Sequence, residues 1–283
     1  MSDNKNISLA DNNDKLNSKT LIMGILNVTP DSFYDGGKYN TIKQALIHTE
    51  QMISEGADII DVGGESTRPG SNSVSQKEEL SRVIPIIDAI NKNFVIPVSI
   101  DTTKSMVARQ ALDSGATIVN DISGLSFDPA LADIVSKYEA QIILCHTSSR
   151  PVDMQKKTLY ENIVEDIYNY LENSIKISED CGILSDNISI DPGFGFGKTA
   201  NHNLLLLKSL SKFKKLNKKV VIGTSMKSFI GKILQSDDIE QRILGTFATI
   251  VISILNGADI VRVHDVKKMK VAVQIADSVR NVN

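Results

Sequence analysis

MGILNVTPDSF, residues 23–33, joins an apolar run to a set of small polar side chains. The apolar part predicts a buried strand, and the polar part begins with Asn27, where that strand would end. Each of the other runs of this kind is continuously apolar instead of alternating, which is typical of strands buried on both faces of a parallel sheet. In all, β-branched runs lie at residues 21–26, 58–63, 96–101, 117–121, 141–146, 187–191, 219–224 and 259–264.

Segments with helical spacing separate these runs, as parallel strands require. Residues 42–53 place apolar side chains at every third or fourth position, and several such segments end in Gly-Ala, at 56–57, 115–116 and 257–258. Eight strand and helix units in 283 residues without a linker predict an α/β fold, a single (β/α)8 TIM barrel. A doubly wound open sheet is the alternative, but it gathers its ligand groups at one switch point, whereas polar residues here follow almost every run.

The composition restricts the class of partner. A formal net charge of -3 and a pI near 5.9 predict no nucleic acid and no membrane as partners, because both usually demand a basic surface. Cys145 and Cys181 have neither metal-ligand nor disulfide spacing, which indicates a cytoplasmic protein with reduced thiols. Residues 1–18 are rich in Asn, Asp, Lys and Ser and are expected to form a disordered polar tail, followed by the barrel domain over 19–283.

Polar side chains end nearly every predicted strand. In a parallel barrel all strand ends point to one rim, so residues spread over the chain are expected to converge on one pocket. A single Asp after a strand is more often a turn or a helix cap, but capping explains a set of this size poorly. The set consists of Asn27, Asp61, Asp101, Asn120, Asp121, His146, Asp191, Thr224, Ser225, Arg262 and His264.

Three loops add to this rim, at residues 27–38, 63–70 and 191–198. Their glycines let the backbone approach a ligand closely, and Arg68 or Lys198 is expected to meet an anion. The loops also contain aromatic rings, which loops rarely expose to solvent, so a flat and partly apolar substrate is expected. These rings are Phe33, Phe194 and Phe196.

The last two strand ends indicate an anion site. Loops at this place in a barrel commonly hold phosphate, and Lys227, Arg262 and His264 lie there. The sequence has no closed cluster of metal ligands, so any Mg²⁺ is expected to arrive with a diphosphate and to be held by few protein atoms, Asn27 among them. His48 and His202 fall in predicted crossover helices away from the rim, where a structural role is expected, and Cys145 is expected in the core.

Six motifs, in order, resemble those of the dihydropteroate synthase family of pterin-binding TIM barrels: MGILNVTPDSF, GADIIDVGGESTRPG, SIDT, VNDISG, DPGFGFGKT and IVRVHDV. The resemblance extends from Leu21 to His264. It implies a transferase of folate biosynthesis that joins 6-hydroxymethyl-7,8-dihydropterin diphosphate to p-aminobenzoate and releases pyrophosphate. It also implies a cytoplasmic homodimer that uses Mg²⁺ and is a target of sulfonamides.

The resemblance assigns roles to individual residues. Diphosphate departure would run ahead of amine attack, with Asp31 near the resulting cation while the loops at 27–38 and 63–70 close and exclude water. The pterin would be held by Asp101, Asn120, Asp191, Lys227 and Arg262, and the diphosphate by Asn27, Arg68, Arg262 and His264, with Mg²⁺ at Asn27. p-Aminobenzoate would contact Phe33, Thr67, Pro69, Phe196 and Ser225, and catalysis would rest on Asp101, Asp31, Lys227, Arg262 and Asn27.

The chain departs from the family pattern at three positions. Met226 stands where Arg is usual, Thr147 where Met is usual, and Tyr34 where Ser is common. Met226 removes a cation near the p-aminobenzoate entrance, so it bears on the second substrate more than on the pterin. Two alternatives stay open: a methyltetrahydrofolate methyltransferase acting with a corrinoid protein, which would not need TPDSF or STRPG, and a non-catalytic pterin-binding paralogue, which only Met226 supports.

Overall fold

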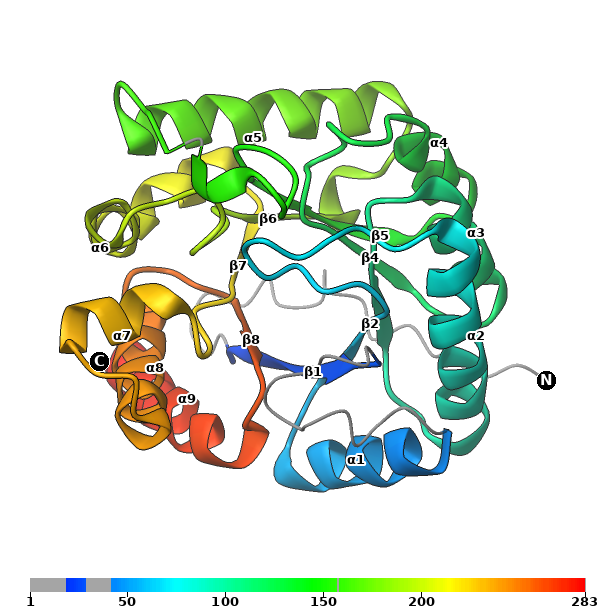
Figure 1. The fold of residues 1–283 in the computed structure, drawn as a ribbon, viewed down its shortest axis with the longest axis horizontal. Helices are drawn as coiled ribbons and strands as arrows, with labels where there is room; N and C mark the ends of the chain where they lie inside the picture. Colours follow the sequence, from blue (N-terminus) through cyan, green and yellow to red (C-terminus); the bar gives the residue numbers. More distant parts are fainter. Residues whose placement is uncertain (1–18, 29–41, 157, 283) are drawn as a thin grey trace.

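Strands and helices alternate to form one closed barrel. The structure, a computed structural model, describes residues 19–28, 42–156 and 158–282. Its parallel strands follow one another in chain order, and the last pairs with the first (Figure 1). The predicted (β/α)8 TIM barrel is confirmed, and an open sheet is excluded. The strands are β1 (Leu21–Asn27), β2 (Ile59–Gly63), β3 (Val98–Asp101), β4 (Ile118–Asp121), β5 (Gln141–Cys145), β6 (Ile188–Asp191), β7 (Lys219–Ile222) and β8 (Ile260–Val263).

Helices surround these strands on the outside of the barrel (Figure 1). Two helices, α7 and α8, follow β7, and α8 packs against α9. The helices are α1 (Ile42–Glu55), α2 (Gln76–Asn93), α3 (Ser105–Asp113), α4 (Ala130–Lys137), α5 (Ile163–Asp180), α6 (Ala200–Lys208), α7 (Ser228–Leu234), α8 (Ile239–Leu255) and α9 (Val266–Asn281). Short 3-10 segments lie at Met154–Lys156, Ser185–Asn187 and Leu210–Leu216.

Capping side chains and glycines set several helix boundaries. Asp265 accepts a hydrogen bond from the backbone N–H of Lys268 at 2.9 Å, and such an N-cap stabilises a helix by about 1 kcal/mol. Gly56, Gly115 and Gly257 follow helix ends with φ of 104°, 100° and 100°, a left-handed conformation that side chains rarely adopt. The Gly-Ala pairs noted in the sequence therefore end helices, as expected.

The barrel interior changes from apolar to polar along its axis. Its apolar floor consists of Met23, Ile59, Ile118, Ile143, Val221 and Ile260. Side chains alternate along a strand, so the residue two positions later faces the same interior. Asp61 follows Ile59 in this way, as Arg262 follows Ile260. The strands thus place charged groups directly above an apolar layer.

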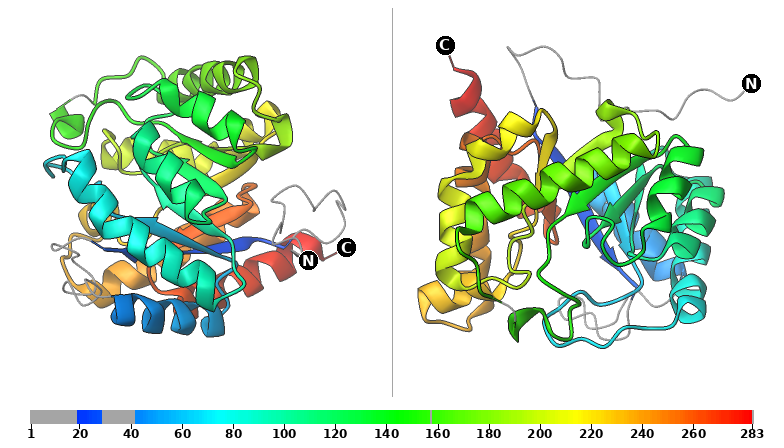
Figure 2. Two further views of the ribbon diagram at one scale, coloured as in Figure 1. Left: turned by 90° about the vertical axis from the view of Figure 1, so that its right-hand side faces the viewer. Right: turned by 90° about the horizontal axis from the view of Figure 1, so that it is seen from above.

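The loops that follow β2 and β5 lie at one end of the barrel, and the C-terminal end of α9 lies at the other (Figure 2). At that far end the chain enters β1 through Thr20, whose hydroxyl donates to Asp277 at 2.7 Å. The polar strand ends lie at the end of the barrel that carries the loops after β2 and β5.

Among the described residues, no helix combines the length and the apolar character needed to span a bilayer.

Candidate active site

The strand register places several polar strand ends at one height. Asn27 pairs with Gly63, and Gly63 pairs with Asp101. Asp101 pairs in turn with Asn120. Because paired residues lie side by side across neighbouring strands, these groups form one row around the mouth of the barrel. The expectation that they share a rim is confirmed.

Arg262 lies at the centre of the mouth and binds two carboxylates. Its Nε donates to Asp61 Oδ2 and its Nη2 to Asp101 Oδ2, both at 2.6 Å. Asn120 Nδ2 also donates to Asp61 Oδ2, at 3.3 Å. Residues far apart in sequence thus form one connected polar network.

Burial and charge shift the protonation equilibria of this network. Burial alone would lower the pKa of Arg262, but attraction to Asp61 and Asp101 raises it above its ordinary value, so the guanidinium stays charged. Burial raises the pKa of Asp101 to about 7 in spite of the opposing charge of Arg262. One cation faces two carboxylates, so Asp101 holds its proton more tightly than an exposed Asp does.

Asp191 ends β6 and is held by the loop that follows. Its Oδ1 accepts the backbone N–H of Gly193 at 2.7 Å, while burial raises its pKa. Gly193 has φ of 73°, and a Cβ there would lie 1.9 Å from the carbonyl oxygen of His146. Only glycine fits this turn, so the DPG sequence keeps the carboxylate at its strand end.

Lys227 and Phe196 come from the loops after the neighbouring strands β7 and β6, and their side chains are in contact. The Lys227 Nζ lies 3.7 Å from the centroid of the Phe196 ring, a cation–π contact. Burial lowers the pKa of Lys227 to about 8, and the charge of Arg262 acts in the same direction. The amine therefore lies close to its titration range at neutral pH.

Ser225 and His264 form a second pair. The backbone N–H of His264 donates to Ser225 Oγ at 3.3 Å, and this hydroxyl lies 2.9 Å from His264 Nδ1. The hydroxyl and Nδ1 are within hydrogen-bonding distance, and a neutral ring whose Nδ1 accepts this hydrogen bond carries its own hydrogen on Nε2. Burial and the charges of Arg262, Lys227 and Arg68 lower the pKa of His264 to about 3, so the ring is neutral.

Lys198 lies inside the loop after β6. It is 4% exposed, and its Nζ donates to the carbonyl oxygens of Gly193 at 2.8 Å and Phe196 at 3.0 Å. Its Nζ also lies 2.9 Å from His146 Nδ1. Burial lowers the pKa of Lys198 to about 7. Of the two residues expected to meet an anion, Arg68 or Lys198, Lys198 is buried with its hydrogens directed at two carbonyl oxygens of its own loop and at His146.

The loop after β2 folds over the mouth toward the loop after β5. The backbone N–H of Gly70 donates to the carbonyl oxygen of Pro151 at 2.9 Å. Ser71 Oγ lies 2.5 Å from the carbonyl oxygen of Ser66 and 2.7 Å from that of Arg68, so its one hydrogen is shared between them and closes the segment on itself. Thr67 and Pro69 are therefore carried on a compact turn.

A small pocket of about 40 Å³, partly open to solvent, lies under this turn. Thr67 and Asp101 both line it, together with Ile122 from the loop after β4. Thr67 is thus brought beside Asp101. Phe196 and Ser225 lie instead beside Lys227 and His264. The structure therefore divides the expected p-aminobenzoate residues into two groups.

Met226 occupies a backbone position of its own. Its φ is 59°, and its N–H donates to Thr246 Oγ1 at 3.1 Å. Its side chain lines a small hollow with Ile243 and Met269, between α8 and α9. Met226, which stands where the family usually has Arg, therefore packs partly against apolar neighbours.

Other expectations fall outside the described residues or concern structure. Asp31 and Phe33 lie outside them, as do Tyr34 and the predicted tail at 1–18. His202 has the expected structural role, since it completes the capping box of α6. Its expected place was wrong: it stacks edge-on against Tyr160, whose hydroxyl donates to the Gly197 carbonyl of the mouth loop at 3.0 Å. Cys145 is 1% exposed and belongs to the core, as expected.

Two residues at the barrel mouth, Asp61 and Lys104, could not be assigned a role from the sequence. Asp61 stood among the strand ends, and its position two residues after Ile59 is the signal that places it inside the barrel. Lys104 follows β3 and contacts carboxylates of Glu65 and Glu79. Nothing in the local pattern around Lys104 distinguishes it from a surface lysine.

The described residues offer few ligands for a metal. They contain no group of three or more His, Cys, Asp or Glu side chains that could hold an ion. Asn27 is the predicted ligand, and its Oδ1 lies 3.6 Å from the point where a Cβ on Gly63 would be. The missing side chain at Gly63 leaves room beside an amide oxygen, which fits a Mg²⁺ ion that keeps water and phosphate ligands.

Comparisons with known proteins agree with this geometry. A sequence profile of the family described as pterin binding enzyme matches residues 23–264. The dihydropteroate synthase of Clostridium beijerinckii is 49% identical over 263 residues, covering 93% of this chain and 95% of that one. The Yersinia pestis dihydropteroate synthase in complex with a sulfonamide drug has a TM-score of 0.90 at 40% identity, covering 94% of this chain and 96% of that one.

A further solved structure, the Xanthomonas albilineans dihydropteroate synthase with 4-aminobenzoic acid, has a TM-score of 0.86 at 37% identity and covers 94% of each chain. The profile match spans most of the barrel, and the chain therefore belongs to the pterin-binding enzyme family. Within that class, the relatives named above are all dihydropteroate synthases. The resemblance inferred from the six motifs is confirmed.

Proposed function

We propose that this protein is a dihydropteroate synthase, which joins 6-hydroxymethyl-7,8-dihydropterin diphosphate to p-aminobenzoate and forms 7,8-dihydropteroate and pyrophosphate. The observation that carries the proposal is the convergence of five predicted pterin-binding residues on one barrel mouth, in a chain whose named relatives are dihydropteroate synthases. These residues are Asp101, Asn120, Asp191, Lys227 and Arg262.

Recognition of the pterin rests on its hydrogen-bonding edges. The ring has a guanidine-like edge that a carboxylate accepts in paired bonds, and Asp191 with Asn120 supplies that complement. Asp101 contacts the far side of the ring, and Lys227 donates to the ring oxygen and N5. The burial of Asp191 and Asn120 supports this role, because a buried polar group demands a partner.

The diphosphate is bound by Arg68, Arg262, His264 and Asn27. A neutral His264 that donates from Nε2 suits a phosphate oxygen without adding charge, while Arg262 stays ionised. Arg262 also stacks on the pterin face. We assign Mg²⁺ to Asn27, where, when bound, it would neutralise charge on the departing diphosphate.

p-Aminobenzoate lies against Thr67, Pro69, Phe196 and Ser225, and the family resemblance assigns Phe33 to the same substrate. The relative from Xanthomonas albilineans with 4-aminobenzoic acid supports this substrate class. The relative from Yersinia pestis with a sulfonamide drug supports sulfonamides as inhibitors. Met226 in place of the usual Arg weakens the pull on the carboxylate of this substrate.

The reaction begins when the bond between the exocyclic carbon and the diphosphate oxygen breaks. The bonding electrons leave with pyrophosphate, and the pterin ring stabilises the resulting cation. The amine lone pair of p-aminobenzoate then forms the new C–N bond, and the nitrogen loses a proton. The family resemblance assigns Asp31 to the stabilisation of this cation, and Lys227, Asp101, Arg262 and Asn27 hold the reacting groups in place.

The protein works as a cytoplasmic homodimer. Its two cysteines are both free thiols, which is usual in a reducing compartment. Large apolar side chains stay exposed along α7 and α8, and such patches commonly mark interfaces. These side chains are Ile233, Leu234, Ile239, Leu244 and Leu255, which are 43%, 43%, 59%, 68% and 46% exposed.

Pyrophosphate release tests the proposal. The purified protein receives the pterin diphosphate and Mg²⁺, with and without p-aminobenzoate, alongside Lys227→Ala. Release that depends on p-aminobenzoate and collapses in the variant supports the synthase. Pterin binding without any effect of p-aminobenzoate would instead support the non-catalytic paralogue, and Met226→Arg is the substitution to test next. Methyl transfer to a corrinoid protein would point to the other alternative.

A further inference from the structure

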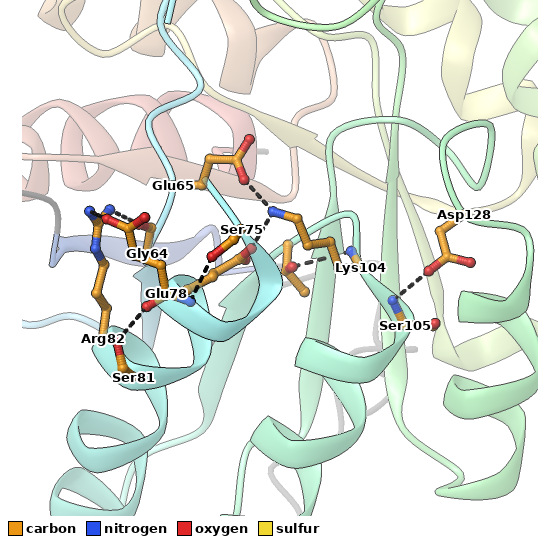
Figure 3. A network of polar contacts seen from close by, with 11 residues as sticks. Gly64, Glu65, Ser75, Glu78, Ser81, Arg82, Lys104, Ser105 and Asp128 are labelled. Atoms are coloured by element: carbon orange, nitrogen blue, oxygen red, sulfur yellow. Dashed lines mark hydrogen bonds and ion pairs between the residues drawn. The ribbon is translucent and has the colours of Figure 1, made fainter. Parts of the chain in front are cut away.

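Lys104 connects three elements at the edge of the mouth. It follows β3, and its Nζ contacts Glu65 Oε2 in the loop after β2 (Figure 3). The same Nζ contacts Glu79 Oε2 on α2. Glu79 is 1% exposed, whereas the side chains of Glu65 and Lys104 are 19% and 24% exposed. A partly buried ammonium thus bridges one loop and one helix, beside the strand that carries Asp101.

Burial disfavours the charged forms of both Lys104 and Glu79. Burial raises the pKa of Glu79, and the hydrogen bond and charge of Lys104 oppose that rise. Burial alone would lower the pKa of Lys104, but its bonds to Glu65 and Glu79 raise it, so the ammonium stays charged. A buried carboxylate that loses its paired cation is strongly destabilised, so Lys104 is held in place by Glu79 and in turn holds Glu65.

A second contact fixes the same stretch of the loop. Arg82 Nη1 donates to the carbonyl oxygen of Gly64 at 2.7 Å, and Arg82 also pairs with Glu78 (Figure 3). A Cβ on Gly64 would lie 2.6 Å from Val83 Cγ1, so the backbone lies directly on α2. Residues 64–65 therefore form the anchored base of the loop.

The rest of the loop depends on that base. Ser71 closes the segment from Ser66 onto itself, and the tip of this segment contacts the loop after β5 through the hydrogen bond from Gly70 to Pro151. A turn closed in this way moves as a unit when its base moves. Thr67, which lines the pocket beside Asp101, moves with it.

We infer that Lys104 is a positioning residue for the second substrate, because its bridge to Glu65 and Glu79 sets the loop that carries Thr67 and Arg68. This inference rests on the proposed synthase function. Lys104 itself touches no reacting atom. Its loss acts on p-aminobenzoate more than on the pterin, whose ring contacts Asp191 and Asn120 lie on other strands.

Steady-state kinetics of Lys104→Met and Lys104→Arg test the inference. Lys104→Met keeps the side-chain length without the charge, and a displaced loop is expected to raise the KM for p-aminobenzoate by about 10- to 100-fold. The KM for the pterin diphosphate is expected to rise by less than this, because Arg68 moves with the loop whereas the other residues assigned to that substrate lie on other strands, and Lys104→Arg recovers most of the loss. Lys92→Met is the matched control, since Lys92 on α2 pairs only with the exposed Asp88 at 2.6 Å in an i,i+4 bridge.

Hydrogen exchange of residues 63–74 provides a readout independent of catalysis. Exchange there is expected to quicken in Lys104→Met and to stay unchanged in Lys92→Met. If Lys104→Met does not fold, Glu65→Gln carries the same test, since it leaves Glu79 paired. Unchanged exchange and an unchanged KM for p-aminobenzoate would overturn the inference. An inactive wild-type protein whose loop still loosens would refute the synthase and leave the bridge established.

Discussion

Replacing Asp61 by Asn tests the network at the barrel mouth most directly. Asp61 is fully buried, and its Oδ2 accepts Arg262 Nε at 2.6 Å and Asn120 Nδ2 at 3.3 Å. Asn has the same shape and still offers an amide oxygen, so Asp61→Asn removes charge with little change in volume. Arg262 then keeps Asp101 as its only ionised partner in this pair of contacts.

The expected loss follows from these two bonds. A hydrogen bond with a charged partner contributes about 1.5–3 kcal/mol, against about 0.5–1.5 kcal/mol for a neutral bond. Two such bonds end on one Asp61 oxygen, and the pair weakens by about 2–3 kcal/mol. At about 1.4 kcal/mol per factor of ten, kcat/KM for the pterin diphosphate falls about 30- to 150-fold.

The pH profile of the variant gives a second, independent sign. In the wild type, burial raises the pKa of Asp101 to about 7, Arg262 opposes this, and the negative charge of Asp61 adds to the rise. Removing that charge lowers the pKa of Asp101. Because ionised Asp101 accepts from the pterin, the rising limb of kcat/KM moves to lower pH in Asp61→Asn.

Stability follows the same linkage. The folded pKa of Asp101 lies above its ordinary value of 3.8, so the unfolding free energy decreases as pH rises from that value through about 7. Asp61→Asn makes this decrease smaller, which urea unfolding at several pH values measures. Asp88→Asn, at an exposed pair on α2, is the control. A kcat/KM within about threefold of wild type, with an unmoved pH limb, would refute the role of Asp61.

Two further predictions concern lysines. Burial lowers the pKa of Lys227 to about 8, so pterin affinity is expected to weaken as pH rises through that value. Lys227→Arg stays charged and is expected to flatten this pH dependence. Fluorescence titration measures the pterin affinity of both proteins, and equal pH dependences in wild type and variant would contradict the prediction. Lys198→Met leaves the Gly193 and Phe196 carbonyl groups without their donor and is expected to lower the unfolding free energy by about 2–4 kcal/mol, whereas a loss below about 1 kcal/mol in urea unfolding would refute its structural role.

The fold followed from the sequence because its cause is local and repeated. The strands are buried on both faces and are separated from one another by helical crossovers, so apolar runs locate all the strands. Their ends were less accurate. β3 begins at Val98 instead of residue 96, and β7 ends at Ile222 instead of residue 224, because the Thr224 carbonyl accepts the N–H of Lys227 in a turn at 3.2 Å. Turn hydrogen bonds of this kind are not visible in hydrophobicity.

The site divides in a similar way. Residues at strand ends, such as Asp101 and Asn120, were predicted correctly to lie together, since strand direction alone places them. The ion pair between Arg262 and Asp61 was not predicted, because Asp61 is 201 positions away and the pairing depends on barrel closure. Lys198 was assigned to an anion because a lysine in a glycine-rich loop gives no sign that the loop folds back over it.

The barrel cannot close during synthesis until its last strand, β8, is available to pair with β1. Until β8 has emerged and folded, β1 presents an open edge that invites pairing with other chains. Arg262 lies in that same strand, opposite Met23 of β1. A polypeptide that ends before β8 therefore lacks both the strand that closes the barrel and Arg262, the cation that binds Asp61 and Asp101.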